Sequence, residues 1–97
     1  MILQPNHINI IQKFFENKPV IKAYLFGSQA RGEANEKSDI DLMVELDYSS
    51  GIGWEFIDMQ LELQKMLACK VDLVSANGFS PHIGPFIEAD KKLIYER

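Results

Sequence analysis

The chain has 97 residues, of which 46% are hydrophobic and 25% are charged. This length predicts a single domain spanning residues 1–97, because single domains usually contain about 100–150 residues. Ten Lys and Arg against fourteen Asp and Glu leave a formal net charge of −4. Non-specific DNA binding needs clustered cations that neutralise phosphates, so we expect no direct contact with nucleic acid.

The only cysteine, Cys69, excludes an internal disulfide, so folding does not require an oxidising compartment. The first ten residues lack the basic start and apolar run of a secretion signal. No window of the sequence approaches the roughly 18 apolar residues that a membrane-spanning helix needs. We therefore expect a cytoplasmic protein without a membrane segment.

The first predicted elements are a helix and a strand. Residues 7–16 place apolar side chains at helical spacing, and Pro5 suits the start of a helix. Residues 20–26 are rich in β-branched and aromatic side chains, which is typical of a strand.

Gly27 and Ser28 end this strand and open a predicted helical turn over residues 28–31. We expect the Ser28 hydroxyl to cap the start of the turn and Gly32 to close it. Backbone N–H groups at a helix start have no partner within the helix, and they suit a phosphate. Glycine allows a close approach and serine adds a donor. An ordinary strand-to-helix turn has the same residues, so the pair alone leaves both interpretations open.

Residues 38–46 alternate polar and apolar side chains with the period of a strand. The alternation predicts one apolar face with Ile40, Leu42, Val44 and Leu46, and an opposite face with Asp39, Asp41, Met43 and Glu45. Further along, the sequence predicts an amphipathic helix over 53–68, a strand over 71–74, a short helix over 85–89 and a final strand over 93–95. The apolar side of the longer helix is predicted to contain Phe56, Met59, Leu63 and Met66, widened by Ile57, Leu61 and Leu67.

Asp39 and Asp41 lie two residues apart on the second strand, so their carboxylates share one face, about 6.8 Å apart at Cα. Two like charges need a compensating partner, and Mg²⁺ is a natural one. Asp72 interrupts the apolar strand KVDLV and can join them if the two strands are neighbours. Three carboxylates could hold two ions, and Asp72 could take the proton of an attacking hydroxyl. A solvated strand end is the alternative for each aspartate.

Together, Gly27-Ser28, ten further residues, Asp39-x-Asp41 and the later Asp72 resemble the DNA polymerase β-type nucleotidyltransferase superfamily. The stretch GSQARGEANEKSDIDLMVELD is similar specifically to its minimal nucleotidyltransferase (MNT) branch. The resemblance covers nearly the whole chain, including the closing LIYE, without a departure from the motif. It implies an α/β (α+β) polymerase β-like fold with a small mixed sheet of about four strands flanked by helices.

The resemblance also implies roles for the matching positions. Gly27 and Ser28 would hold the nucleotide triphosphate, and Asp39, Asp41 and Asp72 would ligate Mg²⁺, as two ions. Arg31, in the Ala-Arg-Gly that follows, would contact a phosphate or a partner protein. The alternative for Arg31 is an ion pair with Glu33 or Glu36.

In the family, this pattern implies an antitoxin enzyme that transfers AMP from ATP to a tyrosine hydroxyl of a HEPN-domain toxin. One alternative is a non-catalytic antitoxin that neutralises the toxin by binding and occlusion. Another is a small-molecule nucleotidyltransferase that inactivates an antibiotic, which we disfavour because the chain has no second lobe to enclose a small substrate.

Overall fold

The computed structural model describes residues 1–47, 49, 55–76 and 84–97. Helices and strands alternate there in the predicted order. The elements are α1 (Pro5–Phe15), β1 (Val20–Phe26), α2 (Ser28–Arg31), β2 (Ile40–Leu46), α3 (Glu55–Leu67), β3 (Val71–Ser75), α4 (Gly84–Asp90) and β4 (Lys92–Glu96). Residues 53 and 54, at the start of the helix predicted over 53–68, lie outside the described residues.

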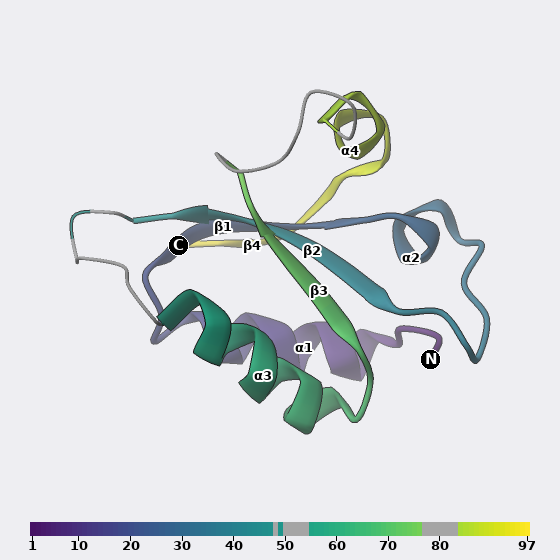
Figure 1. The fold of residues 1–97 in the computed structure, drawn as a ribbon, viewed down its shortest axis with the longest axis horizontal. Helices are drawn as coiled ribbons and strands as arrows, with labels where there is room; N and C mark the ends of the chain where they lie inside the picture. Colours follow the sequence, from purple (N-terminus) through teal and green to yellow (C-terminus); the bar gives the residue numbers. More distant parts are fainter. Residues whose placement is uncertain (48, 50–54, 77–83) are drawn as a thin grey trace.

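The strands form one sheet in the order β3-β2-β1-β4. β1 is antiparallel to both β2 and β4, whereas β2 and β3 run parallel. Helices α1 and α3 cover one face of the sheet, and α4 lies on the other side (Figure 1). The predicted mixed sheet of four strands with flanking helices is therefore confirmed. In the part of the chain that the structure describes, no helix is long and apolar enough to cross a membrane.

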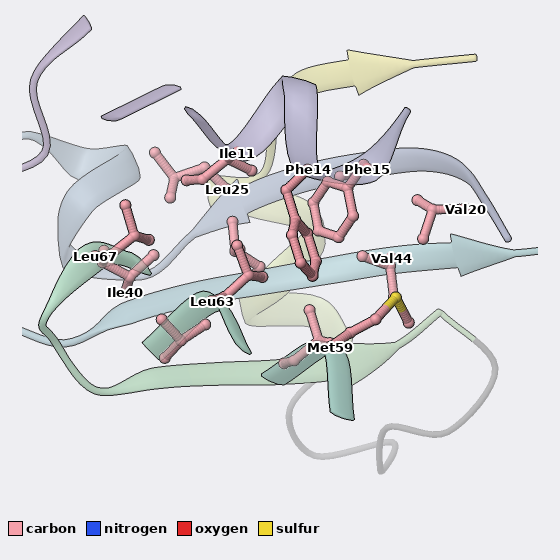
Figure 2. Close-up of a cluster of buried hydrophobic side chains, with 14 of the residues drawn as sticks. Ile11, Phe14, Phe15, Val20, Leu25, Ile40, Val44, Met59, Leu63 and Leu67 are labelled. Atoms are coloured by element: carbon pink, nitrogen blue, oxygen red, sulfur yellow. The ribbon is translucent and has the colours of Figure 1, made fainter. Parts of the chain in front are cut away.

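The hydrophobic core lies between the sheet and the pair α1 and α3. The alternating apolar side of β2 is buried as predicted, and Ile40, Leu42 and Val44 are all fully inaccessible. From α1, the rings of Phe14 and Phe15 meet edge to face with their centroids 5.5 Å apart (Figure 2). Each large side chain that is fully buried contributes roughly 1.5–3 kcal/mol by leaving water. The core therefore fixes which face of each strand points away from α1 and α3.

The opposite face of β2 is less polar than predicted. Met43, expected beside the aspartates on a polar face, is only 3% exposed. Helix α4 lies on this side of the sheet, and its Ile87 is 1% exposed. Buried apolar side chains therefore also occur on the second face of the sheet, the face on which Asp41 lies.

Helix α3 packs through a narrower stripe than predicted. Met59, Leu63 and Leu67 are buried, because residues four apart lie on one side of a helix. Three members of the predicted stripe, Ile57, Leu61 and Met66, are about half exposed. At 100° per residue, Ile57 and Leu61 turn well away from the buried side, so the widening of the stripe was wrong at these two residues and right at Leu67.

Two local predictions about the segment after β1 have opposite outcomes. Gly32 closes α2 in the left-handed conformation with φ 74°, as predicted. The cap by Ser28 was wrong, because Gly27 is the N-cap and no side chain caps this helix. Strand β2 begins at Ile40, so Asp39 precedes the strand instead of lying within it.

Ala68, just after α3, has a φ of 52°, which is the left-handed region that glycine adopts without strain. The side chain is exposed, so its removal loses little packing. We expect Ala68→Gly to raise the free energy of unfolding by about 0.5–1 kcal/mol, measured by urea denaturation. The matched variant Ala89→Gly, at an exposed position within α4, should lower it by about 0.5–1 kcal/mol. Equal effects of the two substitutions would contradict this account.

Candidate functional site

Two of the predicted aspartates meet where β2 lies between its neighbours. Asp41 is paired with Phe26, the last residue of β1, on one side. On the other side it is paired with Asp72 of β3 in parallel register. Both aspartates are half-buried. The sequence did not determine whether these two strands are neighbours. Their pairing brings Asp72 beside Asp41, as the metal-site hypothesis requires.

The close approach of these carboxyl groups changes the titration of Asp41. Its pKa is raised to about 6, first by burial and then by the negative charge of Asp72. A hydrogen bond between the two carboxyl groups and the charge of Asp39 act in the same direction, whereas the charge of Lys70 lowers the pKa. The ionised form of Asp41 is therefore unfavourable in the metal-free protein, and a bound cation would stabilise it.

The glycine that ends β1 packs directly against this pair. Gly27 has φ 75° and ψ −154°, a backbone conformation that is essentially restricted to glycine. A Cβ on Gly27 would collide with Oδ2 of Asp41 and would lie 3.3 Å from its Cγ. The predicted Gly-Ser turn and the Asp-x-Asp strand therefore come together, with Ser28 half-buried as the next residue.

Asp39 stands apart from the paired carboxyl groups. Its side chain is 42% exposed, and Oδ2 lies 3.8 Å from Nζ of Lys70. The sequence analysis missed Lys70. The signal that could have found it is register, because Lys70 directly precedes β3 as Asp39 precedes β2, and the Ile40 N–H donates to the Lys70 carbonyl at 3.1 Å.

Arg31 makes two ion pairs. Its guanidinium lies 3.0 Å from Glu33 and 2.6 Å from Asp90, the last residue of α4. Of the alternatives from the sequence, the structure contains the ion pair with Glu33, and the contact with Asp90 was not foreseen. Arg31 therefore joins the short helix after Gly27 to α4 on the far side of the sheet.

Comparison with known proteins identifies the family to which this site belongs. The family model described as "Polymerase beta, Nucleotidyltransferase" matches residues 9–97. The chain belongs to the polymerase beta nucleotidyltransferase family. A similar protein of Methanocaldococcus jannaschii is named "Putative protein adenylyltransferase MJ1379". The two are 40% identical over 87 residues, which is 87% of this chain and 85% of the relative.

Two solved structures have a similar fold to this nucleotidyltransferase. One is a toxin–antitoxin with AMP-PNP, with a TM-score of 0.78 at 24% identity over 93% of this chain and 73% of the other. The second is a tri-AMPylated Shewanella oneidensis HEPN toxin in complex with its MNT antitoxin. It has a TM-score of 0.74 at 21% identity over 98% of this chain and 74% of the other.

The donor chemistry of the candidate site fits Mg²⁺, the ion that the resemblance implies. Within the described residues, no three side chains of His, Cys, Asp or Glu are placed to hold a metal ion by themselves. Mg²⁺ is commonly bound by one or two carboxylates together with substrate phosphate oxygens. Asp41 and Asp72 offer two such carboxylates, already held together against their repulsion. That Asp39 completes the set stays a prediction.

The raised pKa of Asp41 predicts a pH-dependent stability of the metal-free protein. The folded state favours the protonated carboxyl, so this contribution is present below about pH 4 and is lost as the pH rises through about 6. Asp41→Asn removes the ionisation. In EDTA we expect the variant to exceed the wild type by about 1 kcal/mol at pH 7.5, after allowance for solvent screening, and to equal it near pH 4.

Chemical denaturation at a series of pH values measures this difference. Glu45→Gln, an exposed position on the same strand, is the control and should show no such pH-dependent gain. A wild type that is as stable as Asp41→Asn at pH 7.5 would show that the two carboxyl groups do not strain the folded state.

Gly27 and Gly32 provide a matched pair of substitutions. Both have a positive φ, but only a Cβ on Gly27 meets another atom within 4 Å. We expect Gly32→Ala to cost about 1 kcal/mol of stability through backbone strain. Gly27→Ala should cost about 2 kcal/mol or more, because the strain is joined by the collision with Asp41. Urea denaturation compares the two, and an equal cost would argue against a tight contact between Gly27 and Asp41.

Proposed function

We propose that this nucleotidyltransferase transfers AMP from ATP, with Mg²⁺, to a tyrosine hydroxyl of a HEPN-domain toxin and thereby acts as its antitoxin. The observation that carries the proposal is the meeting of Gly27, Asp41 and Asp72 at one end of the sheet. A turn that admits a phosphate lies there against carboxylates that suit a phosphate-bound cation.

Each of these groups has a part in the proposed site. Asp41 and Asp72 hold Mg²⁺, with Asp39 as the third carboxylate. The backbone at Gly27 and the hydroxyl of Ser28 hold the triphosphate, because a glycine leaves room for close approach and a hydroxyl donates. When bound, Mg²⁺ neutralises charge on the phosphates and lowers the barrier to displacement.

In the proposed reaction the acceptor oxygen forms a bond to the α-phosphorus of ATP, and the bond from that phosphorus to the pyrophosphate oxygen breaks. Asp72 takes the proton of the acceptor hydroxyl and passes it to water, and pyrophosphate leaves with the electron pair of the broken bond. This chain contributes mainly position and charge, which are the main sources of catalysis in phosphoryl transfer.

The comparisons support a protein as the acceptor. The relative that is 40% identical is named as a protein adenylyltransferase, and the chain covers 85% of its length. One structural neighbour is an MNT antitoxin in complex with a HEPN toxin that has been AMPylated. The choice of tyrosine rests on the family resemblance of the sequence motif.

A second candidate is an antitoxin that acts by occlusion alone. It is favoured by the same neighbours, in which proteins of this fold are found in toxin–antitoxin complexes. In that case Asp41 and Asp72 would be kept for their place in the sheet, and neutralisation of the toxin would not depend on them.

The decisive experiment follows label from ATP labelled at the α-phosphate, with Mg²⁺, to a HEPN-domain protein encoded beside this chain's gene. We expect label on a tyrosine, and a loss of roughly a hundredfold or more in Asp39→Asn/Asp41→Asn. Glu45→Gln removes a charge from an exposed site further along β2 and should transfer at the wild-type rate.

A stable complex that suppresses the toxin without label, and equally well in Asp39→Asn/Asp41→Asn, would replace this proposal with occlusion. Mass spectrometry of the labelled partner identifies the modified residue. Label on a side chain other than tyrosine would keep the adenylyltransferase and overturn the acceptor.

A further inference from the structure

The aspartates of the proposed site differ in how their backbone is held. β2 is an interior strand, so Asp41 is anchored by pairing on both sides. Asp72 lies on β3, which is an edge strand, and Asp39 precedes the first residue of β2. An edge strand has a row of backbone groups that no strand satisfies. The structure supplies partners for two of these groups, the N–H groups of Val71 and Leu73, from glutamine side chains.

On the β3 side, two glutamines of α3 accept hydrogen bonds from the residues that flank Asp72. The Val71 N–H donates to Oε1 of Gln64 at 3.2 Å, and the Leu73 N–H donates to Oε1 of Gln60 at 3.1 Å. Both contacts are partly buried. The edge of β3 is therefore closed by side chains on either side of Asp72.

The spacing of these contacts follows from the geometry of the two elements. A helix rises about 6 Å over four residues, and a strand rises about 6.6 Å over two. Gln60 and Gln64 are therefore in step with Leu73 and Val71 when helix and strand run in opposite directions. The match holds two consecutive outward N–H groups of the edge strand at once.

On the β2 side, one glutamine of α2 contacts the backbone before the strand. Nε2 of Gln29 donates to the carbonyl of Asp39 at 3.4 Å and to that of Met1 at 2.5 Å. Its Oε1 accepts from the Leu3 N–H at 3.0 Å. Because Gln29 follows Gly27 and Ser28 by one turn or less, its carboxamide links the Gly-Ser turn, the segment at residues 1–3 and Asp39.

We propose that the carboxamides of Gln29, Gln60 and Gln64 are positioning groups that set the places of Asp39 and Asp72 relative to Asp41. This inference rests on the proposed function, in which these aspartates bind the metal. Groups that orient metal ligands typically change metal affinity or activity ten- to a hundredfold when they are removed. Their hydrogen bonds go to the backbone of Asp39 and of the two residues that flank Asp72, so the glutamines act through the backbone and not as ligands.

The test replaces each contact with a side chain of similar length that cannot make it. Gln29→Met and the double variant Gln60→Met/Gln64→Met remove the contacts. Gln12→Met is the matched control, because Nε2 of Gln12 donates to the Ile94 carbonyl at 2.8 Å, on β4. Binding of Mn²⁺, in the presence of an ATP analogue that cannot be cleaved between the α- and β-phosphates, is followed by electron paramagnetic resonance.

We expect Gln29→Met and Gln60→Met/Gln64→Met to weaken Mn²⁺ binding about tenfold and to lower kcat more than they raise the KM for ATP. Gln12→Met should lose comparable stability yet keep its Mn²⁺ affinity within about twofold. If the Gln29 and Gln60/Gln64 variants bind Mn²⁺ as the wild type does, or if Gln12→Met weakens binding equally, the positioning role is overturned.

Conservative variants separate position from folding. Gln60→Glu/Gln64→Glu keeps both acceptor oxygens and should retain nearly wild-type Mn²⁺ affinity. Gln29→Glu loses the donor to two carbonyls and should be as weak as Gln29→Met. Asp41→Asn is measured beside them, because Mn²⁺ affinity that survives this change would overturn the proposed metal site itself, and not only the role of the glutamines.

Discussion

The parallel pairing of β2 with β3 is the constraint on which the site depends. In this register Asp41 lies beside Asp72, and a slip of β3 by one residue would turn the side chains of β3 to the opposite face of the sheet. Such a slip would expose Val71 and Leu73, which are buried, and would drive the carboxylate of Asp72 into the core. Burial of the apolar face thus fixes the register, and this register brings the two carboxyl groups together despite their repulsion. Burial and, after it, the negative charge of Asp72 raise the pKa of Asp41 to about 6.

Gly27 connects this pair to the end of β1. The register of β1 with β2 places Asp41 opposite Phe26, so the residue that follows β1, Gly27, must pass close to the carboxylate of Asp41. Only a residue without a side chain has room there, and Gly27 also adopts a φ that other residues avoid. The phosphate turn and the carboxylates are therefore joined by direct contact, which fits catalysis by position and charge.

Polar side chains outside the candidate site hold its parts together. Arg31 links α2 to α4 through Asp90. Lys70 forms an ion pair with Asp39, and its positive charge also opposes the rise in the pKa of Asp41. The edge strand β3 is closed by glutamines of α3. A chain of 97 residues with a sheet of four strands has little surplus core. Its polar contacts consequently combine the satisfaction of backbone groups with the support of the site.

The sequence by itself determined the order of helices and strands and the buried side of β2, and it indicated Gly27, Asp41 and Asp72 as candidate site residues, because periodicity and motif spacing are local properties. It overestimated the apolar stripe of α3, since the part of a helix that is buried depends on what lies against it. Only the tertiary structure decided that β3 is the parallel neighbour of β2, that Arg31 pairs with Asp90 and that Lys70 stands beside Asp39. These contacts join segments that are distant along the chain. They depend on the strand order, which is determined by packing of the core and not by any local sequence pattern.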